Sequence, residues 1–235
     1  MNEKNQVQKF NLKNEAILAC GDALNKALLA NKTTPILLLL SGGSALEILE
    51  EILPEALSEK LTISLLDERF SQDKKINNFS QMQTTSFYEL ALAKNCNVIG
   101  TLPRLNENIS EFAKRIEQAL QKWVSENING KIFVTLGMGP DGHTSGIFPV
   151  PDETEFKNLF ENENWVTGYT APHKYSERVT TTITFFRLID EAFALVCGIE
   201  KKSVMDKISE GKEKINILPA LAWKKIKKIT IFTDI

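Results

Sequence analysis

Two patterns of apolar and polar positions alternate along the chain. In residues 14–30 apolar side chains recur at near-helical spacings, which predicts a helix. Residues 36–40 are an unbroken apolar run, typical of a strand buried on both faces of a sheet. The same reasoning predicts helices over 46–53, 80–93, 107–126 and from 201, and strands over 61–66, 98–99, 131–136, 179–185, 192–197 and 228–232, with residues 150–165 irregular or weakly helical.

This alternation of strands and helices favours an α/β class: a Rossmann-like, mainly parallel twisted sheet with helices on both faces. The chain has 235 residues, which fits a single domain over 1–235. Its content of 43% hydrophobic and 25% charged residues is ordinary for a globular protein with a substantial core.

Charge and composition narrow the classes of partner. The formal net charge of −2 argues against nucleic acid, whose binders usually carry a basic excess, but it leaves room for a small anionic ligand. The longest apolar run, PILLLL, is too short to cross a bilayer, and the polar N-terminal segment has no apolar signal core. Three scattered cysteines, Cys20, Cys96 and Cys197, indicate reduced thiols. We therefore expect a cytoplasmic protein without a membrane or nucleic-acid partner.

Chemically unusual residues follow four of the predicted strands, at 41–44, 67–69, 137–143 and 198–201. In parallel α/β sheets, ligands bind beyond the carboxyl ends of the strands. We therefore expect these four turns to face one crevice.

The first turn, SGGS, stands between a strand and a helix. Gly42, Gly43 and Ser44 could present backbone N–H groups at a helix N-terminus to an anion such as phosphate. The alternative is a tight turn in which Ser44 is only the N-cap of the helix.

The second turn, DERF, offers two carboxylates and an arginine. Asp67 could orient a base or bind a sugar hydroxyl, and Arg69 could hold an anion through a forked pair of hydrogen bonds. The alternative is a surface salt bridge with turn chemistry, which fits Glu68 best.

In the third turn, GMGPDGHTSG, Asp141 and His143 flank a glycine. A neutral histidine is the usual general base near pH 7, and a nearby carboxylate can orient it. The alternative is a loop histidine beside a local Asx turn. No metal site is predicted, because the other histidine, His173, lies in a distant loop and is expected to be structural or exposed. Taken alone, Arg178 and Lys201 are typical of solvated surface residues.

Together these segments resemble the 6-phosphogluconolactonase family, within the glucosamine-6-phosphate isomerase/6-phosphogluconolactonase superfamily. The resemblance rests on SGGS, DERF, NNF at 77–79, GMGPDGHTSGIFP, ERVTTT, GIEKKSV, LPA at 218–220 and IFTD, which occur in the family's order. It implies hydrolysis of 6-phospho-D-glucono-1,5-lactone to 6-phosphogluconate in the oxidative pentose phosphate pathway. It implies no metal and no organic cofactor, and a sugar-phosphate substrate. We also expect a monomer or weak homodimer.

The resemblance also implies roles for individual residues. His143 matches the general base, Asp141 its partner, and Asp67 and Arg69 active-site positions. The positions that hold the sugar phosphate in this superfamily correspond to Gly42, Gly43, Ser44, Arg178 and Lys201.

The chain departs from the family pattern in several places. Ala45 and Leu46 replace Thr-Pro after SGGS, Ser80 stands where an arginine is common, and residues 144–149 read TSGIFP in place of TASLFP. Two alternatives remain open. A glucosamine-6-phosphate deaminase would carry a glutamate at Phe148, and a non-catalytic sugar-phosphate sensor would carry a helix-turn-helix ahead of the domain.

Overall fold

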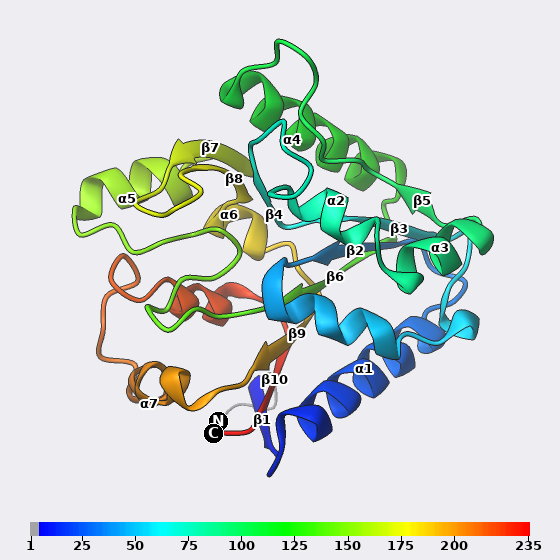
Figure 1. Ribbon diagram of the computed structural model, residues 1–235, viewed down its shortest axis with the longest axis horizontal. Helices are drawn as coiled ribbons and strands as arrows, with labels where there is room; N and C mark the ends of the chain where they lie inside the picture. The colour runs from blue at the N-terminus through cyan, green and yellow to red at the C-terminus, as the bar shows by residue number, and fades with distance from the viewer. Residues whose placement is uncertain (1–4) are drawn as a thin grey trace.

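A seven-stranded parallel sheet forms the centre of the computed structural model, which describes residues 5–235 (Figure 1). Its strand order is β1-β10-β9-β6-β2-β3-β5, and all six neighbouring pairs run parallel. The predicted α/β class is thus confirmed. The strands are β1 (Asn5–Lys9), β2 (Ile36–Leu40), β3 (Leu61–Leu65), β5 (Asn97–Val98), β6 (Lys131–Leu136), β9 (Glu191–Val196) and β10 (Ile229–Thr233).

The four central strands β2, β6, β9 and β10 each supply side chains to two separate cores. In β2, Leu37 and Leu39 join one core, while Leu38 and Leu40 join the other. Both faces are therefore covered, which is why the strand has no polar positions. One face is covered by α1 (Lys13–Ala30), η1 (Gly43–Glu51), η2 (Pro54–Ala56), α2 (Asn78–Met82) and α3 (Ser86–Ala93), and the other by α4 (Ile109–Glu126), α5 (Glu153–Phe160), α6 (Ile183–Phe186), α7 (Lys202–Glu210) and η4 (Pro219–Lys225).

A second, antiparallel sheet of three strands was not predicted. It has the order β4-β8-β7, with β4 (Asp67–Arg69), β7 (Val166–Thr170) and β8 (Glu177–Thr181). The DER segment, predicted as a turn, is therefore a strand that leaves the main sheet just after β3. Its pairing with β8 places Arg69 opposite Arg178.

Several predicted boundaries change in the structure. The helix expected over 46–53 is a 3₁₀ helix that begins at Gly43. The strand expected over 179–185 ends at Thr181, because the Thr182 hydroxyl accepts the Phe185 N–H at 3.3 Å and starts α6. The helix expected over 80–93 is two helices, since Thr85 caps the second.

The N-terminal segment contains a strand where only polar sequence was noted. β1 pairs with β10 at the edge of the main sheet, and the first four residues of the chain lie outside the described part. Within residues 5–235, no helix has the length and apolar character needed to cross a membrane.

Close packing between α1 and η1 fixes the element that follows the SGGS turn. The Asn25 side chain donates to the Glu51 carbonyl at 2.8 Å and accepts the Leu53 N–H at 2.9 Å. At Gly21, an added Cβ would collide with the Cβ of Glu51. The helix therefore needs glycine at this contact.

We expect Gly21→Ala to destabilise the protein, although alanine is the better helix former by about 1 kcal/mol. Overpacking against Glu51 should outweigh that gain, with a net loss of about 1–2 kcal/mol in the free energy of unfolding. Urea unfolding measures this change. In the double variant Gly21→Ala/Glu51→Gly the collision is absent. Its loss of unfolding free energy should therefore be smaller than the sum of the losses in the two single variants. A more stable Gly21→Ala protein would contradict the packing.

Candidate active site

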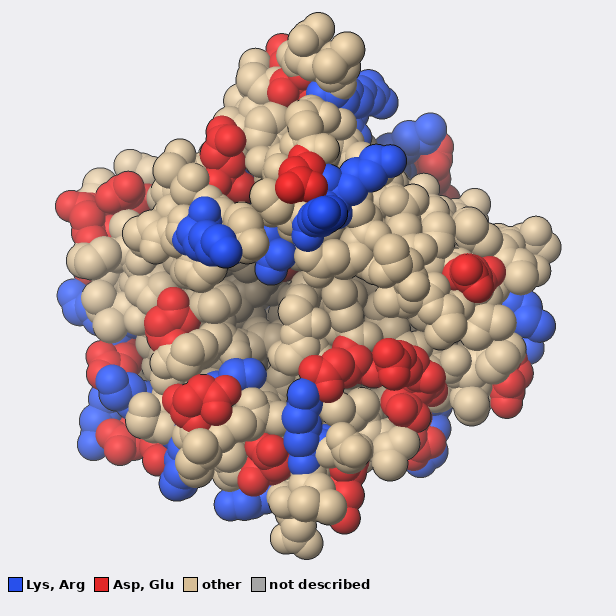
Figure 2. Space-filling model, in the orientation of Figure 1, with Lys and Arg blue, Asp and Glu red and all other residues tan. Residues whose placement is uncertain are grey.

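A cavity of about 240 Å³ opens where several of the predicted turns meet. Figure 2 shows a hollow near the middle of one face, with Lys and Arg side chains along its upper rim and Asp and Glu side chains below and to the right. The turns after β2 and β6 line the cavity, together with β4 and the loop before β8. The turn at 198–201 follows β9 but is not among the lining residues.

The Asp141–His143 pair lies in the loop after β6. The Nδ1 atom of His143 is 2.5 Å from the Asp141 Oδ1 atom, which also accepts the His143 backbone N–H at 3.1 Å. Burial raises the pKa of Asp141, but the hydrogen bond and charge of His143 outweigh it, so this pKa lies below its ordinary value. With Nδ1 engaged by the carboxylate, Nε2 is the imidazole atom left for a ligand.

Three side chains of the site pack against the aromatic ring of Phe148. Its ring stacks on His143 with centroids 4.3 Å apart, and His173 lies 5.2 Å away. The guanidinium carbon of Arg178 is 5.3 Å from the same ring centroid. These contacts fix the orientation of the His143 imidazole.

His173 is exposed, as predicted, and it also lines the cavity. Its Nδ1 atom is 3.5 Å from Nη2 of Arg178. Burial and then the charge of Arg178 lower the pKa of His173. The sequence offered no sign of this position, because it depends on the unpredicted β7–β8 hairpin.

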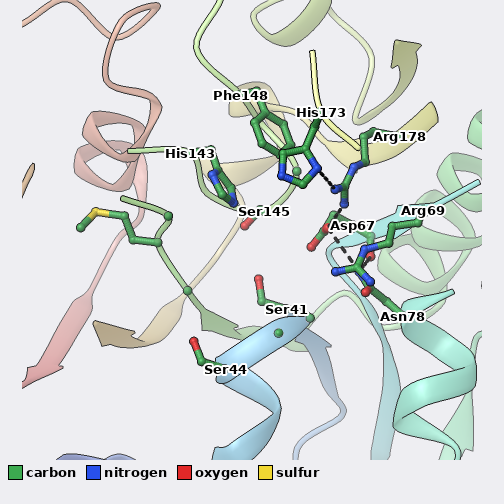
Figure 3. A pocket seen from close by; sticks show the side chains of 16 residues that line it. Ser41, Ser44, Asp67, Arg69, Asn78, His143, Ser145, Phe148, His173 and Arg178 are labelled. Atoms are coloured by element: carbon green, nitrogen blue, oxygen red, sulfur yellow. Dashed lines mark hydrogen bonds and ion pairs between the residues drawn. The ribbon is translucent and has the colours of Figure 1, made fainter. Parts of the chain in front are cut away.

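Asp67 and Arg178 form a buried pair of opposite charges at the wall of the cavity, across from His143 (Figure 3). Arg178 Nη1 is 3.9 Å from Asp67 Oδ2, and Asn78 donates to Asp67 Oδ2 at 3.4 Å and to the Asp67 carbonyl at 3.2 Å. Burial raises the pKa of Asp67, against the effect of Arg178, Arg69 and His143. Arg178 is therefore a buried group of the site, not the solvated surface residue expected of it in isolation.

Arg69 lies across the cavity from the His143 loop in Figure 3. Its Nη1 atom donates to the Ile76 carbonyl at 3.1 Å, and its guanidinium carbon lies 5.1 Å from the Tyr175 ring centroid. These contacts hold the guanidinium at the wall of the cavity.

The SGGS turn places Gly42, Gly43 and Ser44 at the cavity wall. Gly42 is the N-cap of η1, so Ser44 lies inside the first turn and the N-cap alternative for it is wrong. Gly43 has a φ of +65°, a conformation that favours glycine. A Cβ at Gly42 would lie 2.6 Å from the Asn78 Oδ1 atom, so glycine is needed there as well.

Glu68 is buried, so its interpretation as a surface salt bridge is wrong. Its carboxylate accepts the backbone N–H groups of Arg69, Asn78 and Phe79 at 2.8, 2.6 and 2.9 Å, and the Thr101 hydroxyl at 3.0 Å. It thus ties β4 to the start of α2. Burial raises the pKa of Glu68 to about 7, although these hydrogen bonds act in the opposite direction.

Lys201 is buried in η3 (Ile199–Lys201), outside the lining of the cavity. Burial raises the pKa of the Cys197 thiol to about 11, and the charge of Lys201 offsets only part of that effect. Within residues 5–235, no cluster of three or more His, Cys, Asp or Glu side chains could hold a metal ion.

The chain belongs to the family described as glucosamine-6-phosphate isomerases/6-phosphogluconolactonase, whose model matches residues 10–231. The 6-phosphogluconolactonase of Homo sapiens is 28% identical over 206 residues, covering 83% of this chain and 76% of that protein. The Bos taurus 6-phosphogluconolactonase is 27% identical with the same coverage. The 6-phosphogluconolactonase structure from Trypanosoma cruzi has a TM-score of 0.76 at 20% identity, over 99% of this chain and 96% of that one, which shows a shared fold. The family resemblance is thus confirmed.

Glu68→Gln should change how stability depends on pH. The pKa of Glu68 rises from 4.5 in the free side chain to about 7 in the fold, so between these values the folded protein keeps a proton that the unfolded chain has released. The stabilisation that Glu68 gains from this retained proton is therefore complete below about pH 4.5 and is lost by about pH 7. Relative to Glu68→Gln, the wild type should lose roughly 2–3 kcal/mol of unfolding free energy as pH rises through this window.

Urea unfolding of both proteins at intervals across this window measures the difference, and the comparison cancels the titration of all other groups. Glu68→Gln also leaves donors of α2 poorly paired, which lowers its stability at every pH. Parallel curves for the two proteins would show that Glu68 does not titrate in this window.

Proposed function

We propose that this protein hydrolyses 6-phospho-D-glucono-1,5-lactone to 6-phosphogluconate, with His143 as the general base. The observation that carries the proposal is the Asp141–His143 pair, whose imidazole faces a cavity that also contains Arg69, Arg178 and a glycine turn. Such a cavity suits an anionic substrate with an activated ester, and the relatives named above are 6-phosphogluconolactonases.

The proposed reaction needs no covalent nucleophile. His143 Nε2 takes a proton from water as the water oxygen attacks C1 of the lactone. Asp141 stabilises the imidazolium that forms, because its carboxylate accepts the Nδ1 proton. The tetrahedral oxyanion then collapses, the bond from C1 to the ring oxygen breaks, and the imidazolium returns the proton to that oxygen. General-base assistance of this kind typically contributes about 10²–10⁴-fold in rate.

The phosphate end of the substrate is assigned to the cationic and glycine-rich wall. Backbone N–H groups of Gly42, Gly43 and Ser44 suit an anion, because they lie at the start of η1. Arg69 and Arg178 add fixed positive charge, and Lys201 completes the proposed set. Asp67 is proposed to hold Arg178 and to bind a sugar hydroxyl. Holding the phosphate would position C1 beside His143.

The deaminase alternative is disfavoured at Phe148. The family name covers both reactions, so family membership alone does not separate them. A deaminase would need a carboxylate where this chain has a buried aromatic ring stacked on His143. A non-catalytic sensor would have no use for the Asp141–His143 pair. We further propose that the protein acts in the cytoplasm, in the oxidative pentose phosphate pathway, as a monomer or weak homodimer.

The variant His143→Ala should keep the fold and lose most lactonase activity. With freshly made 6-phosphogluconolactone, acid release above the spontaneous rate should fall about 10²–10⁴-fold, because water loses its base. Thermal unfolding of the variant checks the fold, and added imidazole should restore part of the rate. Full activity in His143→Ala would refute the base assignment.

Parallel assays separate the alternatives for the wild type. Ammonia release from glucosamine 6-phosphate without lactone hydrolysis would identify a deaminase. Binding of 6-phosphogluconate without turnover of either substrate would identify a sensor.

Replacing Arg69 or Lys201 should weaken the hold on phosphate. We expect Arg69→Ala to raise KM for the phosphorylated lactone roughly 10–100-fold, because it removes a charged hydrogen-bond donor from the cavity wall. Lys201→Ala should raise KM less, since Lys201 lies outside the lining. Glucono-1,5-lactone, which lacks the phosphate, is the control and should respond to neither change. An unchanged KM in Lys201→Ala would remove Lys201 from the phosphate site.

A further inference from the structure

The loop that follows His143 is fixed by hydrogen bonds on both sides. The Thr144 hydroxyl donates to the Gly137 carbonyl at 2.9 Å and accepts the Trp223 indole N–H at 3.1 Å. The Thr180 hydroxyl donates to the Ser145 carbonyl. The Tyr169 hydroxyl donates to the Gly146 carbonyl at 2.7 Å. The loop is thus held between η4 and the small sheet.

Unlike the Thr144 hydroxyl in the same loop, the Ser145 hydroxyl makes no hydrogen bond to the described residues. Its Oγ atom is buried. The residue also has a φ of +48°, in the left-handed region that L side chains rarely adopt. Both features are unfavourable in the free protein, and both are expected where a side chain is held ready for a ligand.

The Ser145 hydroxyl points into the cavity between His143 and Asp67 (Figure 3). Five buried side-chain polar atoms lack a partner in the described part of the chain, and three of them belong to residues that line this cavity. Besides Ser145 Oγ, these are Asn78 Oδ1, an acceptor, and Arg69 Nε, a donor. A buried acceptor, a donor and a hydroxyl around one space suit a ligand that carries several hydroxyl groups.

We propose that Ser145 determines specificity by hydrogen bonding the hydroxyl on the carbon next to the lactone carbonyl. Ser145 is two residues from His143, and its hydroxyl enters the cavity beside the imidazole that would serve the carbonyl carbon. The nearest substrate hydroxyl to that carbon is the one at C2. A serine hydroxyl can both donate to and accept from it. This inference rests on the proposed lactonase function.

The test compares two substrates in wild type and Ser145→Ala: 6-phosphogluconolactone and its 2-deoxy analogue, prepared by oxidation of the 2-deoxy sugar phosphate. In Ser145→Ala, kcat/KM for the natural lactone should fall about 3–10-fold, as expected for one neutral hydrogen bond. For the 2-deoxy lactone it should be unchanged, because that substrate has no hydroxyl to bind. The wild type should therefore discriminate between the substrates, and the variant should not.

A second variant excludes a purely structural effect. Ser145→Gly relieves the positive φ, so its melting temperature should rise above that of Ser145→Ala, yet the two variants should show the same substrate pattern. Equal losses on both substrates in Ser145→Ala, or no loss on either, would overturn the role of Ser145 while the lactonase function stands. A wild type that accelerates neither lactone would instead refute the lactonase function, and this inference with it.

Discussion

The pairing of β4 with β8 is the contact on which the site depends. It draws a short strand out of the main sheet just after β3 and sets Arg69 opposite Arg178 and Asp67 opposite Thr180. Two arginines that lie more than a hundred residues apart in sequence thereby face one cavity at the carboxyl edge of the main sheet. Two like charges this close need an opposite charge, and Asp67 supplies it beside Arg178.

Two buried carboxylates, those of Glu68 and Asp67, hold β4 in place and act on opposite sides of the strand. Glu68 accepts hydrogen bonds from two successive backbone N–H groups at the start of α2, and so fixes Asn78 and Phe79 against β4. Asp67 faces the opposite way, toward the cavity and Arg178. Adjacent residues of a strand point to opposite faces, so one DER segment serves both the framework and the site.

The parts of the fold that follow from local pattern could be predicted. The continuous apolar strands, the glycine turns after β2 and β6, and the Asp141–His143 pair all have signatures within a few residues. The small sheet could not be foreseen, because β4 has only three residues and both β4 and β7 depend on pairing with β8. The burial of Glu68 depends on donors up to 33 residues away, and the place of His173 depends on the unpredicted hairpin. Ser145 drew notice only as a departure from a motif, since an unpaired hydroxyl is visible only in three dimensions.

Asn78 joins two segments, the glycine turn at 41–44 and β4 at 67–69, that lie more than twenty residues apart in the sequence. Its side chain fills the space that a Cβ at Gly42 would need, while its amide donates to Asp67. The glycine turn and the acidic strand are therefore not independent modules. In a diverging lineage, a larger residue at position 42 would require a smaller one at position 78, and that change would release Asp67 as well. Substitutions at positions 42, 67 and 78 should therefore co-vary among related sequences.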